Sequence, residues 1–339
     1  MIVEAIRVLV EGRSLSIDQA RASMNEIMEG AALPSQIGAF LTALRIKGET
    51  EEEITAFAQV MREKVRKVES RVHAELLDTC GTGGDGSGSF NISTAAAFVA
   101  AGAGVPVAKH GNRSVSSRCG SADVLKELGV NIEAGPEVVS RSLDEAGIAF
   151  IFAPLFHPAM KHAIGPRREI AIRTVFNILG PLTNPAGAKC QLLGVYSGEL
   201  VEKLAGVLLQ LGSRKAYVIH GHGGIDEIAS SGPTKVAELS EGKVKCFSID
   251  PRDFGLKTWP VEAVRGGDAA ENARILKDVL QGAPGAYRDA VLFNAGAAIS
   301  AFHNRMAIAE GIELARESID SGRAKAKLAH LARLTSEKV

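Results

Sequence analysis

Apolar residues in the first 70 positions recur every three or four residues, which is the spacing of one face of a helix. Start signals divide this stretch into helices: Ser16 with Gln19 and Thr50 with Glu53 form capping boxes, and Pro34 starts a helix between them. No strand pattern interrupts these helices. Each has an apolar face that needs a partner, so the pattern predicts a small domain made only of helices.

From Leu76 onward the pattern changes to short apolar runs that alternate with helix-like segments. This alternation is typical of a mainly parallel sheet flanked by helices, with ligands bound at the carboxyl ends of the strands. The predicted fold class is α/β, with a small all-helical domain at 1–70 and a large α/β domain at 71–339. The expected strands are 75–80, 105–110, 148–154, 190–197 and 215–221.

Composition narrows the classes of function. Lys plus Arg and Asp plus Glu each number 39 among 339 residues, so the formal net charge is zero and we expect no nucleic-acid or membrane partner. The four cysteines are scattered without a C-x-x-C pair, which favours a reducing compartment over a disulfide or zinc framework. The N-terminus lacks a basic start and a cleavage site, and no apolar run reaches membrane-spanning length. We expect a soluble, cytoplasmic protein.

A glycine-rich stretch, 78–94, follows the first expected strand and leads into a helix. Its glycines permit positive φ angles and let main-chain amides approach a ligand, while the helix adds free N–H groups and its dipole. Asn91, Ser93 and Thr94 add polar side chains. The alternative is a plain tight turn capped by Ser93. The stretch matches neither the dinucleotide nor the nucleoside-triphosphatase motif, so the pattern favours another phosphate ligand.

A second polar cluster, 109–123, follows the next expected strand. Lys109, Arg113 and Arg118 supply cationic donors, which suit a second wall of an anion site. The alternative is a surface loop that caps the following helix at Ser121.

A third cluster, 156–187, is rich in arginine. The planar fork of an arginine at a pocket edge binds both oxygens of a carboxylate, and Arg167, Arg168 and Arg173 are the candidates. The alternative is a solvated face of a helix. The segment 177–187, rich in Gly and Pro, is a candidate hinge.

The fourth cluster lies beyond the last expected strand, where Asp226 and Glu227 stand side by side. Two hard oxygen ligands at this position suit Mg²⁺, which is often completed by substrate phosphates. Acids in a loop are also commonly just solvated. His220 and His222 have no third ligand at a zinc-site spacing, so a zinc site is disfavoured.

Together the four clusters resemble the anthranilate phosphoribosyltransferases, in GTGGD, NIST, KHGNR, GSADVLKELG, FNILGPLTNP and the DE pair, over essentially the whole chain. The resemblance implies transfer of a phosphoribosyl group from phosphoribosyl pyrophosphate to the amino group of anthranilate, the second step of tryptophan synthesis from chorismate. It also implies Mg²⁺, homodimers formed through the small domain, and a small domain joined by part of 160–188. No residue is assigned as a general base.

The resemblance also assigns site residues. Anthranilate contacts fall on Gly81, Asn112 and Arg167, and Mg²⁺ ligands on Ser93, Asp226 and Glu227. The family usually has Pro-Val before the anthranilate arginine, where this chain has Gly165-Pro166. Phosphoribosyl pyrophosphate contacts fall on Gly81, Gly84, Asp85, Ser89, Asn91, Ile92, Ser93, Thr94, Lys109, His110, Gly111, Asn112, Arg113, Ser114, Val115, Ser116, Ser117 and Ser121.

Two other functions stay open at this point. Pyrimidine nucleoside phosphorylases share the two-domain architecture and a glycine-rich phosphate loop, but the resemblance to them is weaker outside that loop. A non-catalytic relative that binds nucleic acid would need a basic stripe. Zero net charge and the acidic pair disfavour that second alternative.

Overall fold

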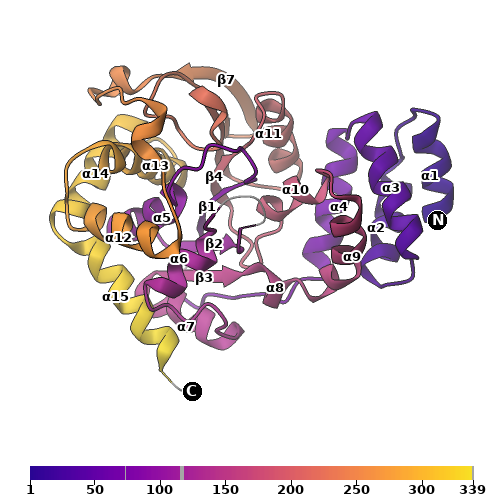
Figure 1. Ribbon diagram of the computed structural model, residues 1–339, viewed down its shortest axis with the longest axis horizontal. Helices are drawn as coiled ribbons and strands as arrows, with labels where there is room; N and C mark the ends of the chain where they lie inside the picture. The colour runs from indigo at the N-terminus through magenta and orange to yellow at the C-terminus, as the bar shows by residue number, and fades with distance from the viewer. Residues whose placement is uncertain (73, 115–117, 338–339) are drawn as a thin grey trace.

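The computed structural model describes residues 1–72, 74–114 and 118–337, and it has a helical lobe beside a larger α/β lobe (Figure 1). Among the described residues, no helix is both long enough and apolar enough to cross a bilayer. The helical lobe contains α1 (Ile2–Val10), α2 (Ile17–Met28), α3 (Pro34–Lys47), α4 (Glu51–Glu63) and α9 (Lys161–Ile170).

The start signals of the N-terminal helices are confirmed. The Ser16 hydroxyl accepts a hydrogen bond from the Gln19 amide at 3.2 Å, and the Gln19 side chain accepts one from the Ser16 amide at 3.0 Å. Thr50 and Glu53 form the same reciprocal pair, and Pro34 is the first residue of α3. Helix α1 was not predicted, because its only sequence signal is an apolar stretch without an N-terminal cap.

Helix α9 lies far along the chain but packs against α2 and α3 (Figure 1). Its Ala163 is fully buried in the same apolar cluster as the N-terminal helices. Gly30 leaves room for the His162 ring, because a Cβ there would lie 2.5 Å from the ring carbon Cε1. The helical lobe is therefore completed by a segment from the middle of the sequence.

The α/β lobe is built on a seven-stranded sheet in the order β3-β2-β1-β4-β5-β6-β7. Strands β1 to β5 pair in parallel, with Leu77 opposite both Val107 and Cys190, so the carboxyl ends of β1, β2, β4 and β5 meet at one edge. The predicted parallel strands are confirmed. The strands are β1 (Leu77–Gly81), β2 (Val107–Gly111), β3 (Ile148–Phe152), β4 (Cys190–Gly194), β5 (Lys215–Gly221), β6 (Thr234–Ser240) and β7 (Lys243–Ile249).

Strands β6 and β7 form an antiparallel hairpin that was not predicted. Its two-residue turn has positive φ at Glu241 (50°) and Gly242 (73°), as a type I′ turn requires. Glutamate is a rare first residue for that turn. The lysines of β7 suit an exposed edge strand, because charged residues discourage pairing with another chain.

Helices cover both faces of the sheet (Figure 1). Helix α5 (Ile92–Gly102) is buried all round, packs against α13 (Ala286–Phe302) and α15 (Arg323–Ser336), and contacts β1. Because α5 is fixed on all sides, its N-terminus has a defined position at the edge where the parallel strands end. The other helices of this lobe are α6 (Ser121–Glu127), α7 (Pro136–Ala146), α8 (Ala153–Phe156), α10 (Phe176–Leu179), α11 (Leu200–Gln210), α12 (Ala269–Leu280), α14 (Ile308–Asp320) and α15 (Arg323–Ser336).

Candidate functional site

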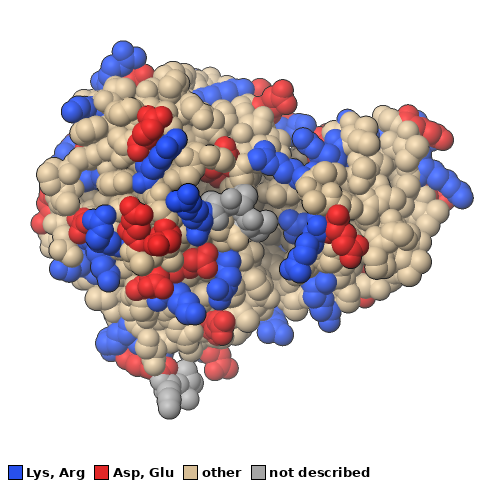
Figure 2. Space-filling model, viewed as in Figure 1, with Lys and Arg blue, Asp and Glu red and all other residues tan. Residues whose placement is uncertain are grey.

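Figure 2 shows a hollow between the helical lobe and the α/β lobe, with Lys and Arg side chains on both sides of it. Three of the predicted polar clusters leave the sheet at the carboxyl ends of β1, β2 and β5. In parallel α/β sheets this edge is where ligands bind.

The glycine-rich loop after β1 is built from left-handed backbone. Gly83, Gly84, Gly86 and Gly88 have φ between 64° and 75°, which side chains disfavour. At the start of the loop, the Thr82 amide donates to the Gly194 carbonyl at 2.9 Å. The loop is therefore an open run of peptide groups anchored to β4.

The far end of the loop is held by a segment that the sequence did not single out. The Phe90 amide donates to the Val264 carbonyl at 3.0 Å, and the Gly266 amide donates to the Gly88 carbonyl at 2.9 Å. Between these bonds, Ser89 forms an isolated bridge with Arg265. A Gly-Gly pair after Arg265 is the only sequence signal for this contact.

The first turn of α5 lies at the site, and its Ile92 amide donates to the Phe90 carbonyl at 2.7 Å. The Asn91 side chain does not cap the helix; it donates to the Cys119 carbonyl at 3.3 Å and accepts from Asn272 at 3.0 Å. The Ser93 amide donates to the Glu227 carboxylate at 3.1 Å. Capping by Ser93, the plain alternative, is therefore not what the structure shows. Ile92 and Thr94 are buried in the same turn.

The acidic pair after β5 reaches back to this loop. Asp226 Oδ2 accepts from the Gly83 amide at 2.7 Å, and the Asp226 amide donates to Asp85 at 3.3 Å. Gly81 permits this approach, because a Cβ there would overlap the Asp226 carboxylate. The two acids are therefore not simply solvated. Asp226 binds an amide of the glycine-rich loop, and Glu227 binds an amide in the first turn of α5.

The electrostatics of the pair fit a cation site. Burial raises the pKa of Asp226 to about 7, with Asp85 adding repulsion, and burial raises the pKa of Glu227 to about 8, with Asp226 adding repulsion. Buried like charges are stabilised by a cation between them. Two carboxylates and the nearby Ser93 hydroxyl are hard oxygen donors, so the residues present fit Mg²⁺.

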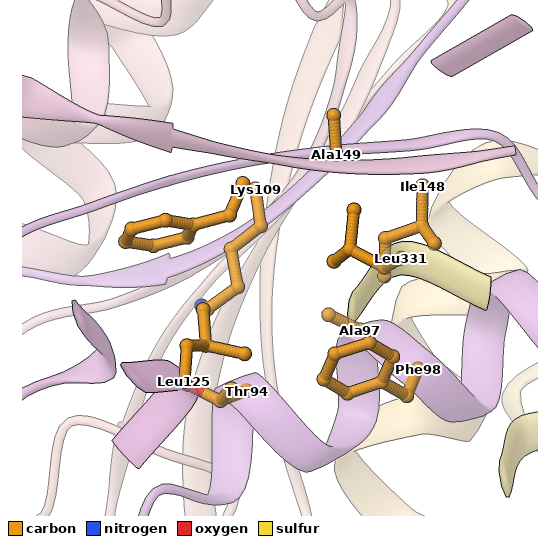
Figure 3. A pocket seen from close by; sticks show the side chains of 9 residues that line it. Thr94, Ala97, Phe98, Lys109, Leu125, Ile148, Ala149 and Leu331 are labelled. Carbon is orange, nitrogen blue, oxygen red and sulfur yellow. The ribbon is translucent and has the colours of Figure 1, made fainter. Parts of the chain in front are cut away.

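Lys109 lies beneath the loop. Its ammonium donates to the Thr79 carbonyl and, at 3.4 Å, to the Ser93 hydroxyl, while burial lowers the Lys109 pKa and the buried Asp78 opposes that shift. Figure 3 shows its side chain running toward Thr94. The cavity beside it has a volume of about 10 Å³ and is lined mainly by apolar groups. That volume fits at most one water molecule, so the cavity is no substrate pocket.

The loop after β2 carries several predicted site residues. The His110 amide donates to buried Asp78 at 3.2 Å, and the Asn112 side chain accepts from the Arg113 amide at 2.7 Å. Arg113 forms an ion pair with Asp123 at 3.7 Å. Asp123 also accepts from the Ser114 amide at 3.3 Å. Val115, Ser116 and Ser117 lie outside the described residues.

Ser121 is the first residue of α6, not its cap, which corrects the capping alternative. The N-cap is Gly120, whose amide donates to the Asp123 carboxylate at 2.9 Å. The Ser121 hydroxyl donates to the Asn112 carbonyl at 3.3 Å. It lies where a side chain on Gly111 would be, so Gly111 and Ser121 fit together closely.

The arginines of the third cluster have different surroundings. The Arg167 guanidinium lies 5.1 Å from the centre of the Phe176 ring and is half-buried, and burial lowers its pKa. Arg168 is exposed. Arg173 donates to the Gly84 carbonyl and lies 4.4 Å from the centre of the Tyr196 ring. Tyr196 was not predicted, because nothing in its local sequence marks it.

The zinc alternative finds no support in the geometry of its histidines. His220 pairs with the Val195 carbonyl at 2.8 Å, and His222 pairs with the Ser231 hydroxyl at 3.1 Å. Within residues 1–72, 74–114 and 118–337, no group of three or more His, Cys, Asp or Glu side chains is placed to hold a metal ion. A Mg²⁺ site at Asp226 and Glu227 would need oxygens from elsewhere, as a bound diphosphate supplies.

Comparison with known proteins assigns the family. Residues 3–65 match the helical bundle domain of a glycosyl transferase family, and residues 73–325 match its a/b domain. The chain is 57% identical to the anthranilate phosphoribosyltransferase of Pelotomaculum thermopropionicum, over 99% of this chain and 97% of that protein. It is 56% identical to that of Desulforamulus reducens, over 97% of this chain and 95% of the relative.

Solved structures agree with this assignment. The crystal structure of anthranilate phosphoribosyltransferase from Thermus thermophilus has a TM-score of 0.93 and 42% identity, with coverage of 98% of this chain and 99% of that one. The enzyme from Saccharomyces cerevisiae, in complex with phosphoribosyl pyrophosphate and Mg, has a TM-score of 0.88 and 30% identity, with coverage of 99% and 98%. The helical bundle, the mixed seven-stranded sheet and the identity to these relatives all agree. The chain belongs to the anthranilate phosphoribosyltransferase family.

Proposed function

We propose that this chain transfers the 5-phosphoribosyl group of phosphoribosyl pyrophosphate to the amino group of anthranilate. The observation that carries the proposal is the meeting of three features at one edge of the sheet. These are the glycine-rich loop amides, the first turn of α5, and the Asp226–Glu227 pair. Amides and a helix N-terminus stabilise phosphate, and the carboxylates suit the cation that accompanies a diphosphate.

The phosphate groups of the substrate would lie along the glycine-rich loop and the loop after β2. Gly81 ends β1, Gly84 and Asp85 come from the glycine-rich loop, and Asn112 and Arg113 come from the loop after β2. The remaining proposed contacts are Ser89, Asn91, Ile92, Ser93, Thr94, Lys109, His110, Gly111, Ser114, Val115, Ser116, Ser117 and Ser121. The Lys109 ammonium already donates to the Thr79 carbonyl beneath the loop, so its positive charge would attract the phosphate groups from the sheet side of the loop.

Mg²⁺ would be held by Asp226, Glu227 and Ser93 together with substrate oxygens. When bound, it would neutralise negative charge on the departing diphosphate. The chain's own part is to bring two buried carboxylates to the loop and to keep them oriented. The amides of Gly83 and Ser93 do this, because each donates to one of the two acids.

Anthranilate would be held by Arg167 and Asn112, with Gly81 between the two substrates. The half-buried guanidinium of Arg167, stacked on Phe176, is better placed than exposed Arg168 to bind a carboxylate in a low-dielectric setting. As the bond from the anthranilate nitrogen to the ribose C1 forms, the bond from C1 to the diphosphate oxygen breaks and diphosphate takes the electron pair. The nitrogen then releases one proton. An aromatic amine is already neutral near pH 7, so positioning replaces a general base.

The lobes would act as the two proposed domains. We propose a small domain of 1–70 joined by part of 160–188, and a large domain of 71–339. Packing of α9 on α2 and α3 supports the joining. Closure between them would exclude water, which competes for the ribosyl centre. The four free cysteines suit a reducing compartment, so we propose a cytoplasmic location.

A homodimer through the helical lobe is also proposed. Val10 is 72% exposed on α1 and Ile46 is 82% exposed on α3, and these two helices pack side by side. Replacing both residues by Glu should shift sedimentation from dimer to monomer. Val72→Glu, at a residue that is 66% exposed in the connection from α4 to β1, is the matched control and should leave the dimer intact. A double variant that still sediments as a dimer would contradict the interface.

The reaction itself is tested by identifying the product. Purified protein with phosphoribosyl pyrophosphate, anthranilate and Mg²⁺ should yield N-(5-phosphoribosyl)anthranilate, detected by its mass. A parallel reaction with thymidine or uridine and inorganic phosphate should yield no free base. Phosphorolysis without the anthranilate product would favour the nucleoside phosphorylase alternative.

A further inference from the structure

Arg173 lies in the short connection between α9 and α10. The residue after α9 is Ala171, which has a left-handed backbone with φ of 51° and donates its amide to the Arg167 carbonyl at 3.3 Å. A left-handed alanine is an uncommon backbone conformation, and Ala171, Ile172 and Arg173 are all exposed. After this turn the chain runs toward the α/β lobe, and Arg173 lies at the glycine-rich loop.

The Arg173 side chain contacts the loop and an aromatic ring together. Its Nη2 donates to the Gly84 carbonyl, and its guanidinium lies 4.4 Å from the Tyr196 ring centre. Among the described residues it forms no ion pair with a carboxylate. A positive charge is therefore kept at a loop that is proposed to bind phosphate, without an acid to neutralise it.

Tyr196 is itself tied to the loop from the other side. It follows β4, and its amide donates to the Thr82 hydroxyl at 3.1 Å. The first residues of the loop are thus held between Tyr196 and Arg173. Because the Gly84 carbonyl and the guanidinium share a hydrogen bond, we expect a ligand that moves Gly84 to shift the guanidinium as well.

The same segment carries the arginine proposed to hold anthranilate. Arg167 lies in the last turn of α9, and its guanidinium packs on Phe176 of α10. The short connection from Arg167 to Phe176 therefore contacts the glycine-rich loop through Arg173, and it carries the proposed anthranilate ligand Arg167 at its other end. A cation over an aromatic ring and a charge-assisted hydrogen bond each favour one position of the guanidinium, so the two contacts together restrict this connection.

We propose that Arg173 is a positioning residue that couples the two substrate sites: a phosphate ligand in the glycine-rich loop fixes Arg173 between Gly84 and Tyr196 and so orients Arg167 for the carboxylate of anthranilate. This inference rests on the proposed function and adds the link between its two substrates. Coupling of this kind is reciprocal, so anthranilate must tighten the phosphate ligand by the same factor.

The test measures anthranilate binding with and without diphosphate and Mg²⁺. Diphosphate fills the loop but supplies no ribosyl group, so no turnover occurs. Equilibrium dialysis with fluorescence detection gives the anthranilate Kd for each protein, and the ratio of the two Kd values is the coupling factor. The variants are Arg173→Gln, Arg173→Lys, Tyr196→Leu and Tyr196→Phe. Lys161→Gln, at an exposed cation at the start of α9, is the control.

In wild type, diphosphate should tighten anthranilate binding by about tenfold, within the usual range of coupling between sites. Arg173→Gln and Tyr196→Leu should bring the factor close to one while the Kd without diphosphate changes by less than about twofold. Tyr196→Phe keeps the ring and should keep the coupling, as should Lys161→Gln. Arg173→Lys keeps the charge but loses the planar stack, so it should lower the factor even if the glutamine variant fails to fold.

Two results would overturn the inference: a coupling factor of one in wild type, or an unchanged factor in both Arg173 variants. Failure of the proposed function looks different, because wild type would then give no anthranilate product with phosphoribosyl pyrophosphate. A merely structural role for Arg173 would lower the melting temperature and weaken both ligands alike. In that case the coupling factor would stay at its wild-type value, which also counts against the inference.

Discussion

The carboxylate of Asp226 accepts a hydrogen bond from the amide of Gly83 at 2.7 Å, although 143 residues separate the two in the sequence. One is an acid beyond β5, and the other is a peptide group of the loop after β1. The contact places a proposed Mg²⁺ ligand within the loop proposed to hold diphosphate. The glycine-rich loop and the acidic pair would therefore recognise the same ligand, a magnesium diphosphate.

Removing the charge of the pair should weaken Mg²⁺ use. The double variant Asp226→Asn and Glu227→Gln should lower kcat/KM by about tenfold or more and raise the Mg²⁺ concentration needed for half-maximal rate. Exposed acids on α7 provide the control, Glu137→Gln with Glu145→Gln, which should behave as wild type. If the double site variant gave the same Mg²⁺ dependence as wild type, neither acid would be a ligand of the metal.

The affinity for Mg²⁺ should depend on pH. The pKa values of Asp226 and Glu227 are raised to about 7 and about 8, so in the metal-free protein both carboxyls lose their protons as pH rises through that range. Mg²⁺ binds the ionised forms, and its apparent Kd should fall by up to about tenfold per pH unit for each proton displaced. Calorimetric titrations at pH 6, 7 and 8 measure this. A constant Kd would contradict the assignment.

The same shifts predict how stability changes with pH. Both acids have a higher pKa folded than unfolded, so their protonated forms favour the fold. This contribution is fully present below the unfolded pKa near 4 and is lost as pH rises through about 7 to 8. The free energy of unfolding of metal-free wild type should therefore fall between pH 5 and 9. In Glu227→Gln the fall should be smaller. Urea unfolding at several pH values is the measurement.

Arg167→Ala should impair anthranilate use selectively. Without the guanidinium, the KM for anthranilate should rise by about tenfold or more, whereas the KM for phosphoribosyl pyrophosphate should change far less. Lys161→Ala is the control on the same helix. An unchanged anthranilate KM would show that another cation holds the carboxylate.

Gly194 is predicted to be irreplaceable for packing. Its added Cβ would overlap the backbone carbonyl of Asp226, which lies on the segment that positions the acidic pair. Gly194→Ala should therefore lower the free energy of unfolding by about 2 kcal/mol, as overpacking of a well-packed site usually does. Gly135→Ala is the control: it has open space and ordinary backbone angles, so it should lose only the modest preference for Gly over Ala at the N-cap of α7. Equal melting temperatures for the two variants would contradict the close contact.

Local signals predicted the fold well where they were strong. Capping boxes located α2 and α4, and the apolar run at 215–221 matched β5. The β6–β7 hairpin was missed because Glu241 is an unusual residue at a positive φ in its turn. Helix α1 was missed because it starts without a side-chain cap. Helix α1 packs on α2 and α3, and β6 pairs with β5, and neither contact is visible in the segment's own sequence.

The candidate site was predictable as a set of loops but not as a set of contacts. Glycines, hydroxyls and adjacent acids indicate phosphate and metal chemistry by their residue types. The bond from Gly83 to Asp226 and the stack of Arg173 on Tyr196 depend on tertiary approach, which sequence spacing does not contain. Arg265 is a further example, because its bridge to Ser89 joins two distant loops.

The most direct measurement of the central claim follows anthranilate fluorescence over time in the presence of purified protein, phosphoribosyl pyrophosphate and Mg²⁺. Loss of the signal, matched one for one by diphosphate release and absent when Mg²⁺ is omitted, is the predicted result. A flat trace from folded protein would contradict phosphoribosyl transfer to anthranilate and would mean that the glycine-rich loop and the acidic pair serve another acceptor.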